Sequence, residues 1–147
     1  MPTIEKFLPT AQKRMCCIGS DAALLRAARL LENDYDMLLV CDTDGRMIGV
    51  LTKTDAVRQI GICTGASCTA PVVEAMTREV TTATPDGQLE DAWKIMKTRG
   101  FKNIPVVDPD GSPLGVLNAR DVLQILWNDV QREEELLFNY VMNVGYR

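Results

Sequence analysis

The sequence contains an internal repeat, and the repeat limits the folds open to the chain. The segment from Val40 to Asp55 returns from Val106 to Asp121 at a fixed offset of 66 positions. Identical residues recur at Asp42, Asp44, Gly45, Gly49, Val50, Leu51 and Asp55. Such a repeat predicts two copies of one folding unit. A copy of about 65 residues would have only a marginal core alone, so we expect the two copies to pack together with paired clefts between them.

Composition excludes several classes of function. The net charge of −4, with no cluster of Lys and Arg, argues against nucleic acid or an anionic membrane as the main partner. No apolar run approaches the roughly 20 residues of a spanning helix, so we expect no membrane insertion. The N-terminal residues show no secretory pattern, and the five cysteines are an odd number. We therefore expect a cytoplasmic protein with free thiols.

The chain has no histidine and no Cys-x-x-Cys pair. It therefore lacks the commonest general base and the usual zinc ligands, and we expect no catalytic residue, no metal and no enzymatic activity. A redox role for the adjacent Cys16 and Cys17 is a weaker alternative.

Each copy shows the order strand, helix, strand, strand, helix, which predicts an α/β fold. Helices are expected after Ser20-Asp21 and, with Thr84 as the cap, after Thr84-Pro85. Two strands follow around an Asp-Gly turn, a strong hairpin signal. Pro105 predicts an edge or a break in the ladder. The extended segments lie at residues 15–18 and 79–83, the hairpin strands at 37–41, 47–51, 103–107 and 114–117, and the second helices follow Leu51 and Leu117.

These patterns divide the chain into four parts: a first copy at residues 8–62, a linker at 63–71, a second copy at 72–127, and an amphipathic C-terminal helix at 128–147. Apolar residues Trp127, Val130, Leu137, Val141 and Val144 fall near one face of that helix. The face either packs on its own domain, or forms a dimer contact or a dock for a partner.

The segments Thr52-Lys53-Thr54-Asp55 and Asn118-Ala119-Arg120-Asp121 each lie at a strand-to-helix junction. Both are helix-cap patterns, which explains them without a ligand. The same geometry also suits a nucleotide, because a helix N-terminus presents free N–H groups to phosphate and an Asp can accept from ribose hydroxyls. Lys53 and Arg120 would add positive charge.

The ordered set of motifs, taken twice over residues 8–127, resembles a tandem pair of cystathionine β-synthase (CBS) domains, a Bateman module. The segments 72–77, 80–85 and 100–108 resemble the family's second motif. The resemblance implies a pseudo-two-fold module with two clefts, which in many members bind adenosine nucleotides and regulate an enzyme or transporter. It also implies a homodimer.

The resemblance implies two sets of ligand-binding residues. The first cleft would use Thr52 and Asp55, with Met37, Leu38 and Leu39 beside the base. Cys17 would contribute from the lead-in segment, which is the extended segment at residues 15–18 that precedes the first helix of the copy. The second would use Asn118, Arg120 and Asp121, with Lys102, Asn103, Ile104 and Pro105 beside the base and the lead-in hydroxyls of Thr82 and Thr84. Asn118 replaces the usual hydroxyl, and Cys17 and Gly19 replace Thr82 and Thr84. One cleft is therefore expected to be weak, and the second keeps more of the pattern.

We therefore expect a regulatory module that binds an adenine nucleotide such as AMP, ADP or ATP, or S-adenosylmethionine, without a tightly bound cofactor. It would signal to a partner or through dimerisation. The alternative is an interaction or assembly module with vestigial clefts. The sequence leaves open the ligand, the occupied cleft and the regulated partner.

Overall fold

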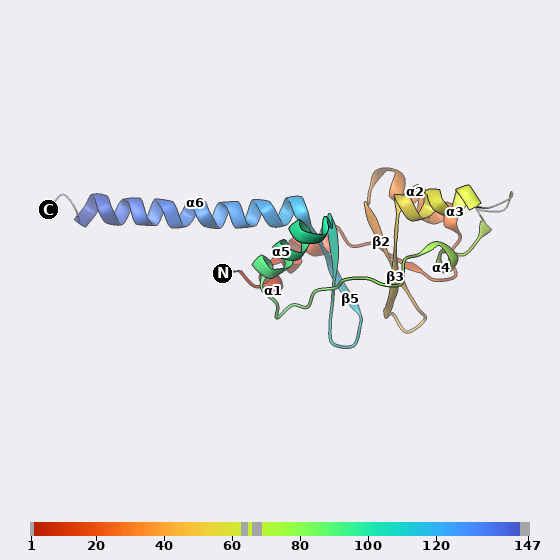
Figure 1. Cartoon of the computed structure of the whole chain (residues 1–147). Coiled ribbons are helices and arrows are strands. Elements are labelled where there is room, and N and C mark those ends of the chain that lie inside the picture. The colour runs from red at the N-terminus through yellow and green to blue at the C-terminus, as the bar shows by residue number, and fades with distance from the viewer. Residues whose placement is uncertain (1, 63–64, 66–68, 145–147) are drawn as a thin grey trace.

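The computed structural model describes residues 2–62, 65 and 69–144 and confirms a mixed α/β fold made of two similar halves (Figure 1). Most of the expected linker, residues 63–71, lies outside the described residues. The elements in chain order are α1 (Ile4–Lys13), β1 (Cys17–Gly19), α2 (Leu24–Asn33), β2 (Met37–Cys41), β3 (Met47–Thr52), α3 (Lys53–Ile62), α4 (Val72–Ala75), α5 (Leu89–Arg99), β4 (Asn103–Val107), β5 (Pro113–Asn118) and α6 (Ala119–Val144).

The two sheets differ because of one proline. In the first half, β1 runs parallel to β2 and β2 pairs antiparallel with β3. In the second half, β4 pairs with β5, and the lead-in segment adds one bridge, between Ala83 and Val106. The Leu39 N–H donates to the Cys16 carbonyl at 2.9 Å, whereas Pro105 at the equivalent position has no N–H. Of the edge or break predicted at Pro105, the structure shows the edge, because β4 pairs with β5 without interruption at Pro105 and the expected strand at residues 79–83 is reduced to one bridge.

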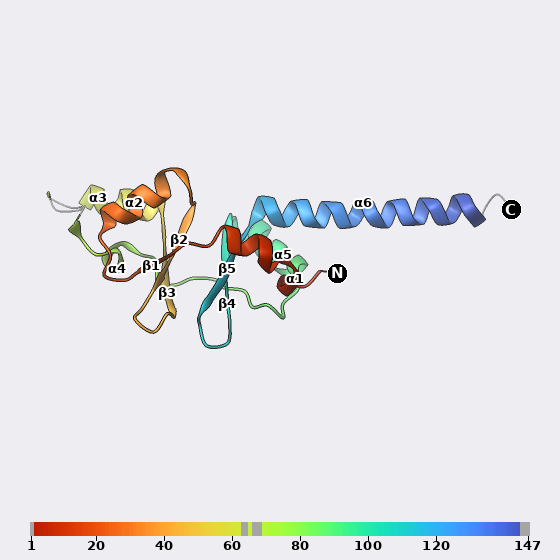
Figure 2. The ribbon, with the colours of Figure 1, turned by 180° about the vertical axis from the view of Figure 1, so that it is seen from behind.

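The segment leading into each copy packs on the other copy. From α1, Ile4, Phe7 and Ala11 lie in the core of the second half, and Figure 2 shows α1 beside α5 and β5. In the reverse direction, Thr77, just after α4, pairs with Val50 of β3 through two backbone hydrogen bonds. Residues 8–13, which the repeat assigned to the first copy, therefore pack on the second. This exchange interlocks the halves.

The exchange also explains where two helices begin. The predicted caps at Ser20-Asp21 and Thr84 are wrong, because α2 begins at Leu24 and α5 at Leu89, both without a side-chain cap. The residues before them form turns instead, and the Leu24 N–H donates to the Ala70 carbonyl and the Leu89 N–H to the Pro2 carbonyl. Backbone carbonyls of the exchanged segments thus satisfy helix-start donors that a side chain would otherwise cap.

A small apolar cluster between the sheets joins two larger cores. Leu39, Val50 and Val116 form its buried centre, with Met15, Met37, Met47 and Val80 partly buried around it. The strand ends that border this cluster therefore come from both halves, which places the two strand-to-helix junctions near one another.

The last helix is longer than expected. The boundary expected between residues 127 and 128 falls inside α6, a single helix of 26 residues that projects from the body (Figures 1 and 2). Val122 is buried in the second core, whereas every residue from Gln131 to Asn143 is exposed. Among the described residues, no helix has the length and apolar character required to cross a membrane.

Candidate ligand-binding site

A cleft lies where the two halves meet. It has two adjoining parts, with cavity volumes of about 910 and 510 Å³, and small-molecule sites commonly measure roughly 300–1,000 Å³. Both parts are lined by Arg14, Asp36, Met37, Lys53 and Asn103. The cleft is therefore continuous and draws side chains from both copies.

The larger part is cationic. The beginnings of α3 and α6 both line it, through Lys53 and Thr54 and through Ala119 and Arg120. Helix N-termini carry partial positive charge and free N–H groups. Arg14 and Lys102 add to Lys53 and Arg120, so four basic residues face one acidic residue, Asp36. This part of the cleft is suited to an anion.

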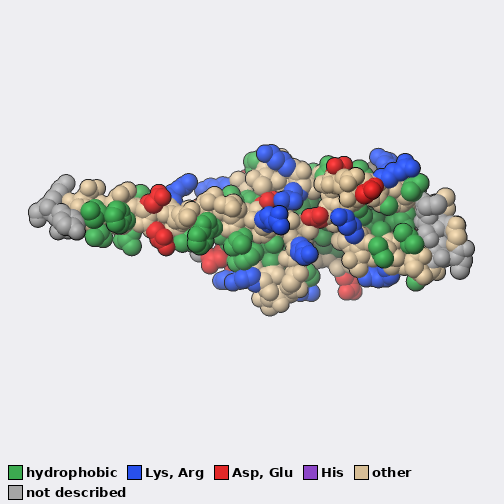
Figure 3. All heavy atoms as spheres, turned by 90° about the horizontal axis from the view of Figure 1, so that it is seen from above, with side chains coloured by type: hydrophobic (Ala, Val, Ile, Leu, Met, Phe, Trp, Pro, Cys, Tyr) green, Lys and Arg blue, Asp and Glu red, His purple; other side chains and the backbone are tan. Residues whose placement is uncertain are grey.

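The smaller part has balanced charge. Its basic residues are Lys13, Arg14 and Lys53, and its acidic residues are Asp34, Asp36 and Asp121. Apolar surface comes from Tyr35, Met37 and Val116. Carboxylates that accept hydrogen bonds beside an apolar wall suit a hydroxylated ligand with a flat apolar ring. On the face drawn in Figure 3, Lys and Arg side chains gather over the middle of the body with acidic side chains among them.

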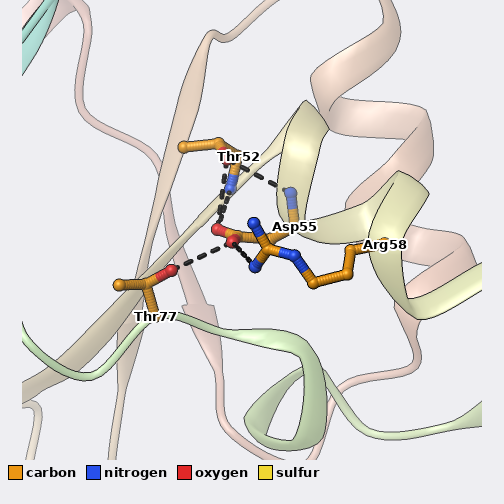
Figure 4. A network of polar contacts seen from close by, with 4 residues as sticks. All are labelled: Thr52, Asp55, Arg58 and Thr77. Atoms are coloured by element: carbon orange, nitrogen blue, oxygen red, sulfur yellow. Dashed lines mark hydrogen bonds and ion pairs between the residues drawn. The ribbon is translucent and has the colours of Figure 1, made fainter.

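Asp55 is part of a structural network (Figure 4). Its carboxylate accepts hydrogen bonds from the Thr52 N–H at 3.0 Å, the Thr52 hydroxyl at 3.1 Å and the Thr77 hydroxyl at 2.9 Å. Arg58 adds an ion pair at 3.3 Å from a largely exposed side chain. Asp55 is 4% exposed and lines neither part of the cleft. Asp55 therefore acts in the helix cap, as one of the two interpretations of this junction predicts, and its carboxylate is occupied by protein donors.

At the equivalent junction in the second half, the helix cap is an Asn side chain and the Asp takes no part in it. The Asn118 side-chain oxygen accepts from the Arg120 N–H at 3.0 Å, and its amide donates to the Asn103 side chain at 3.0 Å. Asn118 therefore caps α6, and Asp121 is free of that task. Asp121 instead forms a two-point ion pair with Arg14, including an Nη2–Oδ1 contact of 2.9 Å. This hydrogen bond raises the pKa of Arg14, partly opposed by burial.

The cleft contains only some of the residues expected from sequence. Leu38, Leu39, Ile104 and Pro105, which were expected beside the base, are buried within the sheets and do not line the cleft. Cys17, Thr82 and Thr84 are exposed and line neither part, and the Thr84 hydroxyl donates to Asp86. The expected residues that do line it are Met37, Thr52, Lys102, Asn103, Asn118, Arg120 and Asp121.

Arg14, Tyr35 and Asp36 are among the cleft residues that sequence reasoning missed. Arg14 follows the exchanged helix α1, so no local pattern places it beside Asp121 in the other copy. Tyr35 and Asp36 lie in the turn before β2, where the first copy is one residue shorter than the second. That change in repeat length is the one signal in the sequence that marks the turn as specialised.

Cys16, Cys17 and Cys41, the cysteines that the structure describes, line neither part of the cleft. Cys41 is buried, and burial, followed by the nearby Cys17 thiol, raises its pKa from 9.0 to about 12. Burial also raises the pKa of Cys16. Among the residues that the structure describes, no group of His, Cys, Asp and Glu is arranged to hold a metal ion.

Comparisons with known proteins agree with this architecture. The CBS domain family model matches residues 11–62 and 72–128. An uncharacterized 17.7 kDa protein of Acidianus ambivalens is 29% identical over 122 residues, covering 82% of this chain and 73% of that protein. Inosine-5'-monophosphate dehydrogenase of Nitrosopumilus maritimus is 26% identical over 106 residues, which cover 71% of this chain and 21% of the enzyme. The chain thus spans about a fifth of that enzyme's length.

Two solved structures show the same fold. The CBS domain pair of protein MJ0100, in complex with 5'-methylthioadenosine and S-adenosyl-L-methionine, has a TM-score of 0.72 at 20% identity, covering 88% of this chain and 98% of that one. The cytosolic domain of the Mg²⁺ channel MgtE, in complex with ATP, has a TM-score of 0.63 at 24% identity, covering 77% of this chain and 45% of that one. With two matched domains over most of its length, the chain belongs to the CBS domain family as a tandem pair followed by a long C-terminal helix.

Proposed function

We propose that this CBS pair is a regulatory module that binds an adenosine-containing nucleotide in the cleft between its halves. One observation carries the proposal: the N-termini of α3 and α6 line a single cavity with four basic side chains. Aligned helix N-termini and basic side chains are the usual means of holding phosphate groups. The proposal therefore uses one continuous cleft in place of the two clefts expected from the repeat.

The two parts of the cleft suit different parts of a nucleotide. Phosphates would lie between Lys53, Lys102 and Arg120 in the cationic part. Ribose hydroxyls would donate to carboxylates of the smaller part, and the base would lie against Tyr35 and Met37. Adenosine is favoured among nucleosides because the CBS pairs of MJ0100 and MgtE are seen with adenosine-containing ligands.

The free energy of ligand binding would be coupled to a change in the relative position of the two halves. The Arg14–Asp121 ion pair lies in the lining of the smaller part of the cleft and joins the residue after α1 to α6. A bound nucleotide would compete for both groups, and would shift any equilibrium between arrangements that it binds unequally. The module would then signal to a separate enzyme or transporter in the cytoplasm, or through self-association.

An assembly module without a ligand is the second candidate. The observation in its favour is that Asp55 and Asn118, two of the expected ligand residues, are fully engaged as helix caps. If the remaining residues do not bind a nucleotide, the repeat serves the fold alone.

Calorimetric titration and thermal shift with AMP, ADP, ATP and S-adenosylmethionine test the proposal, with adenosine and inorganic triphosphate as separate arms. Binding should raise stability by about 2.7 kcal/mol at a hundredfold excess over Kd. Lys53→Ala should weaken nucleotide binding by about tenfold or more, because a hydrogen bond to a charged group is lost. The matched control is Lys94→Ala, an exposed lysine of α5 outside the cleft lining. Absence of binding by all four ligands would favour the assembly module.

A further inference from the structure

The distal half of α6 has no partner within the described chain. The helix projects from the body (Figures 1 and 2), and every residue from Gln131 to Asn143 is exposed. Nevertheless, its last turns are apolar on nearly every side, and Figure 3 shows hydrophobic side chains along it. Helices that are apolar all round are normally buried. The large apolar side chains there, each 44–65% exposed, are Leu136, Leu137, Phe138, Tyr140, Val141 and Met142.

A second apolar patch lies on the proximal half of the same helix. Leu123, Trp127 and Val130 are 48%, 55% and 47% exposed. With Glu134, Leu137 and Val141 they follow alternating steps of four and three residues. This heptad spacing forms a continuous seam that is typical of helices packing on one another. The seam joins the two patches across an acidic middle, Glu133 to Glu135.

We propose that the partner of this seam is α6 of a second copy of the chain, packed antiparallel. The apolar area supports a second copy. Nine large apolar side chains of α6 are exposed, and at roughly 100 Å² each they present on the order of 900 Å² per chain. A stable interface of standard size buries about 800 Å² per partner. Five of the nine lie in the seam, so a partner helix on that side would bury more than half of the area of such an interface.

The position of Glu134 determines the orientation. In a parallel pair in register, Glu134 would face its own copy inside the seam, and like charges there are unfavourable. An antiparallel pair centred near Arg132 instead places Glu134 beside Val130 of the second copy. Leu123 then lies beside Val141, and the distal apolar segment covers the proximal patch. A 26-residue helix is about 39 Å long, so each tip reaches the other copy's proximal turns.

The mass of the full chain in solution, measured by light scattering and sedimentation without nucleotide, tests the proposal independently of the proposed ligand. We expect a dimer for the natural sequence. Leu137→Glu should weaken dimerisation by about 100-fold or more, because it buries a charge in the seam of both chains. Asn139→Glu adds the same charge on the opposite side of the helix and should leave the dimer intact. A monomer at all concentrations, or equal effects of the two variants, would overturn the proposal.

Cross-linking tests the orientation. Under mild oxidation, the double variant Leu123→Cys/Val141→Cys should form disulfide-linked dimers, because the two positions meet between antiparallel copies. Val141→Cys alone should not exceed the background of the natural cysteines. Efficient cross-linking of the Val141→Cys variant alone would show a parallel pair and overturn the antiparallel arrangement.

Discussion

Asp55 and Asp121 occupy equivalent positions in the repeat, yet the structure predicts different consequences for their removal. Asp55→Ala deletes the acceptor of three hydrogen bonds, one from a backbone N–H and two from hydroxyls, at a site that is 4% exposed. Net losses of about 1 kcal/mol per bond give a destabilisation of about 3 kcal/mol. The Arg58 ion pair adds little because that side chain is 65% exposed.

Asp121→Ala should cost less, about 1 kcal/mol, because its partner Arg14 is 38% exposed and remains solvated after the change. Urea unfolding of both variants measures the difference directly. In a thermal scan, Asp55→Ala should lower the Tm by roughly 6–12 °C, given about 2–4 °C per kcal/mol for a chain of this size. Equal losses in the two variants would refute the reasoning, as would an Asp55→Ala variant of natural stability.

Three further predictions follow from local geometry. Gly115→Ala should destabilise the fold by about 1–3 kcal/mol in urea unfolding, because a Cβ there would lie 2.7 Å from the Ala11 Cβ, whereas Gly61→Ala meets nothing within 4 Å in α3 and should be neutral or stabilising. The pKa of Cys41 is raised from 9.0 to about 12, so the folded state holds the thiol proton more tightly than the unfolded state does. The contribution of this thiol to the unfolding free energy is therefore fully present below pH 9.0 and is lost as the pH rises toward about 12. Cys41→Val should make the unfolding free energy decline less steeply above pH 9. A double-mutant cycle between Arg14→Met and Asp121→Asn should give a coupling of about 1 kcal/mol, and zero coupling would show that the ion pair does not help to hold the exchanged segment against α6.

The repeat predicted the helix, strand, strand, helix order within each copy, the two hairpins and the edge at Pro105, because these depend on local chemistry that the sequence carries directly; the helices α1 and α4 were not predicted. An Asp-Gly turn needs a residue that tolerates positive φ, and Gly45 and Gly111 have φ of 80° and 87°. The helix starts were mispredicted where tertiary contacts replaced local ones. Ser20 and Thr84 have suitable side chains, but carbonyls of Ala70 and Pro2, supplied by exchanged segments, receive the bonds that a cap would make.

For the site, the sequence identified the two strand-to-helix junctions and therefore Thr52, Asn118, Arg120 and Asp121. The sequence could not show that the Asp55 carboxylate is occupied by hydrogen bonds within its junction, whereas Asp121 pairs with Arg14. Thr77 and Arg14 each reach these carboxylates from the opposite copy of the repeat. Residues separated by 107 positions leave no local signal of their contact.

The sequence by itself determined that the chain is a duplicated unit with helix N-termini at two matched junctions. Hydrophobic spacing and turn chemistry act over a few residues, and each copy contains its own set. Only the tertiary structure decided that both junctions open into one cationic cleft, and that α6 leaves the body with its apolar seam exposed. Both outcomes depend on how the copies exchange their leading segments and pack together, and this packing results from long-range burial that no short pattern encodes.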